Sequence, residues 1–158
     1  MIGSLANQLR QAVEQEHAAL LSLSDAMSAA QQPQPEGWSP KEELGHLIDS
    51  AANNHQRFVR AALEADYRGP GYAQDDWVRL HGYAALPWAE LVEFWYRYNL
   101  LLAHLVARIP EEKSGTSCTV GAGAPVTLGF LIDDYILHMR HHLDHLLGRE
   151  VVTQYPRR

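Results

Sequence analysis

Two histidines on the apolar face of one predicted helix constrain this chain more than any other feature. The segment 134–146 carries four of the nine histidines, all within eight residues. On a helix that turns about 100° per residue, His142 falls inside the apolar stripe and His138 at its edge, one turn away. His141 and His145 fall further round, towards the solvent side or a subunit contact. The stripe itself is formed by Leu128, Ile132, Tyr135, Met139 and Leu146.

Buried imidazoles need polar partners, and the spacing of this pair permits two interpretations. A cluster of histidines can be a solvated face, and one histidine on an apolar face is more often a hydrogen-bonded core residue than a ligand. Two inward imidazoles lose hydration unless both find partners. A divalent metal ion satisfies both, because a helical His-x-x-x-His pair lets two ring nitrogens reach one ion. The spacing alone leaves a metal site and a core pair equally open.

Hydrophobic periodicity predicts four long helices separated by proline- and glycine-containing segments. The segment 31–37, with two prolines, is a predicted connector. The segment 111–125 is glycine-rich and is predicted to be a loop or a small hairpin. The predicted helices span residues 4–30, 39–65, 87–109 and 127–148.

Three of the helix ends carry recognisable capping residues. Ser39, Pro40 and Glu42 form a capping-box arrangement, with serine at the N-cap, proline at the first helical position and glutamate at the third. Thr127 is placed to cap the fourth helix, and Gly148 to end it. These signals set the beginnings of the second and fourth helices more firmly than periodicity does.

Four long helices with no convincing strand pair predict an all-α fold, a four-helix bundle that forms one domain over residues 1–158. The segment 66–86 joins the second and third helices, and at about twenty residues it is long for a connector in a compact domain. It is either a crossover that sets the order of the helices or the wall of a pocket, and one segment can serve as both.

Charge and hydropathy exclude several classes of partner. The formal net charge is −6 and no basic stripe is present, which argues against binding to nucleic acid. The first residues lack the features of a signal peptide, and no segment reaches the length of a membrane span. We therefore expect a cytoplasmic protein with no membrane partner. Cys118 lies in the predicted loop 111–125, where a structural thiol is expected rather than a nucleophile.

A third metal ligand is expected from the second helix, because metal sites in bundles are built from facing helices. His46 lies beside the apolar stripe of that helix, in its second turn. If the second and fourth helices are antiparallel neighbours, His46 can meet His138 and His142 at one end of the bundle. Asp49 and Asp134 lie one turn from His46 and His138, so each could orient a ligand through its outer ring nitrogen or be a solvated carboxylate.

Several sequence blocks resemble one known family. They are Gly-Trp-Ser-Pro-Lys-Glu at 37–42, His-Leu-Ile-Asp-Ser at 46–50, Asn54, Arg-Phe at 57–58, and Tyr135 with the histidine-rich block 138–146. At these residues the chain resembles the DinB/YfiT-like family of metal-dependent helical bundles, closest to its YfiT-like branch, over most of its length. The resemblance implies that His46, His138 and His142 hold the metal. The helical wheel selects the same inner pair.

The resemblance also implies a function. Three neutral imidazoles leave a divalent ion, Zn²⁺ or Ni²⁺ being favoured by such ligands, with an open position for catalysis. Similar proteins include bacillithiol S-transferases, which implies a metal-dependent transferase that joins a low-molecular-weight thiol to an electrophilic small molecule. A metal-dependent hydrolase that acts through bound hydroxide is one alternative. A non-enzymatic, dimeric metal-binding bundle is another.

The environment of the metal should separate these functions. A catalytic ion must face a cavity, and we expect its walls to come from residues 67–83 and 111–125. A structural ion should be closed off by a fourth protein ligand, for which His81 is best suited and Cys118 is the softer alternative. We expect the open site.

We also expect a homodimer. Aromatic side chains near the edges of the apolar stripes, including Trp88, Phe94 and Trp95, could form a helix-to-helix contact between subunits. Members of the resembling family commonly dimerise through helix faces, and a twofold arrangement is the simplest.

Overall fold

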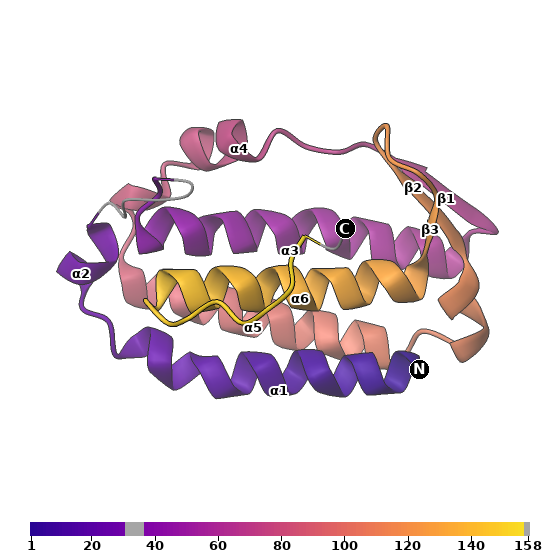
Figure 1. The fold of residues 1–158 in the computed structure, drawn as a ribbon, viewed down its shortest axis with the longest axis horizontal. Coiled ribbons are helices and arrows are strands. Elements are labelled where there is room, and N and C mark those ends of the chain that lie inside the picture. Colours follow the sequence, from indigo (N-terminus) through magenta and orange to yellow (C-terminus); the bar gives the residue numbers. More distant parts are fainter. Residues whose placement is uncertain (31–36, 157–158) are drawn as a thin grey trace.

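The computed structural model describes residues 1–30 and 37–156, so most of the predicted connector 31–37 lies outside the described residues. Four long helices form the body of the fold, as the sequence predicts (Figure 1). The helices α1 and α6 run in one direction, and α3 and α5 run in the other. Both α1 and α3 pack against α5 and α6. Their bounds are Ile2–Leu21 for α1, Pro40–Leu63 for α3, Trp88–Ala107 for α5 and Leu128–Leu146 for α6.

The apolar faces of the four helices meet in one hydrophobic core. Every residue of the predicted stripe on α6 is buried. Trp88 and Trp95, which we expected near a subunit contact, are buried in this core as well. Phe94 remains 55% exposed. None of the helices within the described residues is both long and apolar enough to cross a membrane.

The first predicted helix is interrupted. Instead of one helix over residues 4–30, α1 ends at Leu21 and a short helix α2 (Asp25–Ala29) follows. The Ser24 hydroxyl accepts a hydrogen bond from the amide of Met27 and so begins a new helix. Asp25 then accepts from the Trp88 amide and forms an ion pair with Lys41. These contacts with α3 and α5 turn the chain where local periodicity predicts continuation.

The predicted caps of α3 and α6 are confirmed. The Ser39 hydroxyl accepts from the Glu42 amide, and the Glu42 carboxylate accepts from the Ser39 amide, which completes the capping box. Thr127 accepts from the amide of Phe130 at the start of α6. Gly148 follows the end of that helix with a φ of 68°, a conformation that favours glycine. Two of the helices that carry the candidate site therefore begin where the sequence predicts.

The connector 64–87 is a crossover. It contains the strand β1 (Asp66–Gly69), the helix α4 (Gln74–His81) and the 3-10 turn η1 (Tyr83–Ala85). Because α3 and α5 run in the same direction, the connector has to return along the length of the bundle (Figure 1).

A close contact holds the end of the connector against α3. Gly45 lies against the ring of Tyr83, and a Cβ atom on Gly45 would lie only 2.0 Å from the Cδ2 atom of that ring. The glycine therefore permits the approach.

A small sheet closes one end of the bundle. The strands β2 (Ser117–Val120) and β3 (Val126–Thr127) form the small hairpin that was one of two predictions for residues 111–125, after a 3-10 turn η2 (Glu111–Gly115). The strand β1 pairs in parallel with β2. Periodicity did not indicate this parallel pair, because strands of two to four residues are too short to show alternation. Cys118 is buried in this sheet, opposite Tyr67.

Candidate metal centre

The three histidines chosen from the sequence lie together between α3 and α6. These helices are adjacent and antiparallel, which places His46 in the second turn of α3 opposite His138 and His142 in the second half of α6. All three side chains are buried, and one ring nitrogen from each lies within 4.8 Å of the others. The Nε2 atoms of His46 and His138 are 3.0 Å apart. Two bonds of about 2.0–2.1 Å to a shared ion can span such a separation.

Burial keeps the imidazoles of His46 and His138 neutral. The pKa of His46 is lowered to about 3, mainly by loss of hydration and secondly by the charge that His142 would carry. The same two causes hold the pKa of His138 well below its ordinary value. A neutral imidazole offers one nitrogen lone pair, so the two Nε2 atoms that approach each other here can both bind a divalent cation between them. The residues present therefore fit a metal ion.

Glu43 is a functional residue that the sequence reasoning missed. Its buried carboxylate accepts hydrogen bonds at 2.8 Å from Nδ1 of His142 and from Nδ1 of His145. A proton on Nδ1 of His142 leaves Nε2 with the lone pair that a metal needs. His145, expected towards solvent or a subunit contact, therefore points to this carboxylate. The sequence feature that could have indicated this role is the position of Glu43, one turn before His46 on the same predicted helix.

His138 is positioned from α3. The Ser50 hydroxyl lies 3.5 Å from Nδ1 of His138, and the Asn54 amide donates to the carbonyl of Ser50 at 2.9 Å. Asp134, the carboxylate considered for this role, lines the cavity beside His138. Ser50 and Asn54 both belong to blocks that carried the family resemblance, although neither was assigned a role.

Asp49 binds the connector instead of the outer nitrogen of His46. Its Oδ1 accepts a hydrogen bond from the Tyr83 hydroxyl at 2.6 Å and lies 3.1 Å from Nδ1 of His81. Among the described residues, neither Nδ1 of His46 nor Oδ2 of Asp49 has a hydrogen-bond partner. Burial raises the pKa of Asp49, against the opposing effects of Tyr83 and His81. The structure thus does not support the orienting role suggested for Asp49.

A polar cavity of about 180 Å³ adjoins the histidine cluster at His138. The connector supplies part of its wall, as expected, so this segment is both crossover and pocket wall. The segment 111–125 contributes none of the lining among the described residues, because it forms the sheet at the other end of the bundle. Besides His138, the polar side chains that line the cavity are Ser50, Asn54, Arg57, Tyr72, Gln74, Asp134, Tyr135 and Tyr155.

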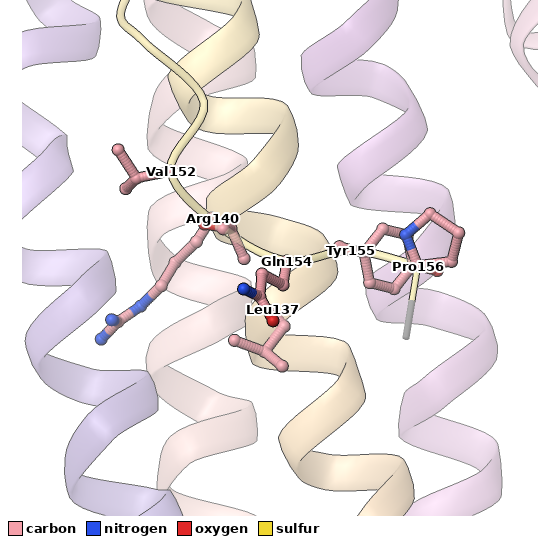
Figure 2. Close-up of a pocket in the computed structure, with 7 residues that line it drawn as sticks. Leu137, Arg140, Val152, Gln154, Tyr155 and Pro156 are labelled. Atoms are coloured by element: carbon pink, nitrogen blue, oxygen red, sulfur yellow. The ribbon is translucent and has the colours of Figure 1, made fainter. Parts of the chain in front are cut away.

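The chain after α6 forms an unexpected wall of the site. It folds back along α6 and brings the ring of Tyr155 to 5.1 Å from the ring of His138, between centroids. Figure 2 shows this segment beside Leu137 and Arg140 of α6. Residues of the segment and of α6 together line a hollow of about 810 Å³. Residues 149–156 carry no helical periodicity, so the sequence offered no signal for this placement.

Comparisons with known proteins agree with the geometry. A family model described as the DinB superfamily matches residues 8–146. A comparison with curated proteins gives no match. Among solved structures, the chain is similar to YfiT from Bacillus subtilis, described as a probable metal-dependent hydrolase with an unusual four-helix bundle topology. The TM-score is 0.82 at 16% identity, over 93% of this chain and 84% of that chain, which shows a shared fold. Since the family model spans most of the sequence, the chain belongs to the DinB superfamily.

Proposed function

We propose that this protein is a metal-dependent enzyme that transfers a low-molecular-weight thiol to an electrophilic small molecule, with His46, His138 and His142 as the metal ligands. One observation carries the proposal: three buried imidazoles converge beside a polar cavity, and no fourth side chain joins the cluster within the described residues. His81 faces Asp49 instead, and Cys118 lies in the sheet.

The ligands determine what the ion can supply. A divalent ion held by three neutral imidazoles lowers the pKa of a thiol or a water in its open position, and so supplies a nucleophile at neutral pH. Imidazole ligation favours Zn²⁺ or Ni²⁺. Glu43 orients His142, and Ser50 faces the outer nitrogen of His138, so α3 supplies the groups that position both α6 ligands.

The lining of the cavity supports a thiol as the nucleophile. A water molecule needs no further binding site, whereas a polar thiol compound needs groups that hold its body beside the metal. The guanidinium of Arg57 lies at this cavity, within 3.4 Å of the Asn54 side-chain oxygen, and can bind a carboxylate. Tyr72 and Gln74 add hydrogen-bonding groups from the connector.

A hydrolase is the second candidate, and the description of YfiT favours it. The same three histidines and the same cavity would serve that reaction. The two functions differ in one respect that is easily measured, because only the transferase consumes a thiol.

An assay with monochlorobimane tests the proposal. Conjugation of this electrophile should require both bacillithiol and Zn²⁺ or Ni²⁺, and the His138→Ala variant should lose it. The His104→Ala variant, altered at an exposed position of α5, is the matched control and should keep full activity.

The other outcomes identify the alternatives. Hydrolysis of an ester such as 4-nitrophenyl acetate that needs the metal but no thiol would replace the transferase with the hydrolase. Absence of both activities in fully metal-loaded protein would favour the non-enzymatic bundle.

A further inference from the structure

A second cavity, of about 570 Å³, lies between the connector and α5 and shares no lining residue with the polar cavity at the metal centre. Its floor is the face of α3 that carries Asp49. At about 100° per residue, His46, Ser50 and Asn54 lie roughly 60°, 100° and 140° around the helix axis from Asp49. Ala52 and Ile48, which also line this cavity, lie roughly 60° and 100° from Asp49 in the other direction. The volume is in the range of small-molecule binding sites.

Aromatic side chains from the connector and from α5 form two walls of this cavity. The connector supplies Trp77, His81 and Tyr83, whose successive ring centroids lie 5.9 and 5.1 Å apart. The helix α5 supplies Phe94 and Tyr98, with centroids 5.7 Å apart. Phe94 is more than half exposed, so a large apolar side chain stands open to solvent beside the hollow. Flat apolar walls of this kind suit an aromatic or apolar body.

The charged groups of the cavity are acidic. Asp49 is only 2% exposed, and its Oδ2 atom has no hydrogen-bond partner among the described residues. Glu90 adds a second carboxyl group, and none of the described residues that line the cavity is a lysine or an arginine. A buried carboxylate with one uncompensated oxygen is unfavourable, and a nearby cation offsets that cost. The faces of the aromatic rings also attract cations.

We propose that this cavity binds a small organic cation with an aromatic or apolar body. The body would lie between Trp77 and Phe94, and the cationic group would point to Asp49. His81, which is exposed and stands 3.1 Å from Asp49, is the side chain that an entering ammonium group would displace. This site is separate from the metal centre and does not depend on the function proposed for it.

Three probes of matched shape test the proposal by isothermal titration calorimetry: 1-naphthylmethylammonium, 1-naphthoate and 1-naphthalenemethanol. The ammonium compound should bind at least about tenfold more tightly than the alcohol, because only the cation gains from the carboxylate and the ring faces. The naphthoate should not bind. Removal of the metal with a chelator should leave these results unchanged.

Two variants locate the site. Asp49→Asn should remove the preference for the cation, and Phe94→Ala should weaken binding by about tenfold through loss of one aromatic wall. Leu101→Ala alters another exposed apolar residue of α5 that lies outside the cavity, and it should bind as the parent protein does. Phe94 and Leu101 are both exposed, so neither change should prevent folding.

The proposal is overturned if none of the probes binds, if naphthoate binds as tightly as the ammonium compound, or if Phe94→Ala leaves binding unchanged. It is also overturned if sedimentation shows a dimer that Phe94→Ala dissociates, because a second copy of the chain would then cover this surface.

Discussion

At the scale of residues, the carboxylate of Glu43 connects the two helices that form the metal centre. Glu43 is 1% exposed and belongs to α3, yet it accepts hydrogen bonds from two histidines of α6. A buried carboxylate is tolerated only when its oxygens are compensated, and the two Nδ1 atoms provide that compensation. In return the carboxylate sets the tautomer of His142, a candidate ligand.

Metal binding should therefore separate ligands from positioning residues. Loss of most bound metal is expected for His138→Ala and His142→Ala, whereas His141→Ala should retain it. Glu43→Gln should weaken binding by about 10–100-fold, because it removes the group that orients His142. Elemental analysis of the purified variants measures the amount of bound metal, and titration against a chromophoric chelator measures its affinity. Retention by His142→Ala together with loss by His141→Ala would mean that the assigned ligands are wrong.

At the scale of elements, the helix α3 contributes residues to both the metal centre and the aromatic cavity. One side supplies His46, Ser50 and Glu43 to the metal centre, and another supplies Asp49 to the aromatic cavity. Gly45 lies one turn before Asp49 on the second of these sides, and its missing side chain admits the ring of Tyr83. A glycine inside a helix lowers its stability by about 1 kcal/mol relative to alanine. Here the close packing of the connector against α3 explains why a glycine occupies position 45.

Gly45→Ala should therefore destabilise the protein despite the better helix propensity of alanine. A Cβ atom at this position would overlap the Tyr83 ring, and overpacking of this kind lowers the free energy of unfolding by about 1–3 kcal/mol. Gly3→Ala is the matched control, because nothing lies within 4 Å of the added atom. That change should raise stability by up to about 1 kcal/mol. Urea unfolding followed by circular dichroism measures both, and equal gains in the two variants would contradict the packing argument.

At the scale of the whole molecule, the buried His46 links folding to pH. The folded pKa of His46 is about 3, chiefly because of burial, whereas an unfolded histidine has a pKa of about 6.5. Between these values the unfolded chain binds a proton that the folded chain does not. Stability of the metal-free protein therefore rises with pH across this window and is fully present only above about pH 6.5.

Unfolding of the metal-free protein between pH 5 and 6.5 measures this linkage. The contribution of one such histidine is a slope of about 1.4 kcal/mol per pH unit near pH 5, which falls to about half that value at pH 6.5. In the His46→Gln variant the slope should fall by about that amount, since the substituted residue does not titrate. Equal slopes in the two proteins would show that His46 takes up its proton without unfolding.

The sequence alone determined the features that depend on neighbours a few residues apart. Helical periodicity placed His138 and His142 inward and named the residues of the α6 stripe, and capping residues set the beginnings of α3 and α6. These features are local because a helix repeats every 3.6 residues and its caps act within one turn. That His46 would join this pair was implied by the family resemblance, since periodicity does not determine which helices are neighbours.

Only the tertiary structure decided which distant groups meet. Glu43 and His145 are 102 residues apart in the sequence, and their contact requires the relative position of two helices. The pairing of β1 with β2, the break after α1 and the placement of Tyr155 beside His138 likewise depend on surfaces that form when the helices pack. A buried polar group accepts whichever partner that packing brings within about 3 Å, and local sequence patterns carry no information about that partner.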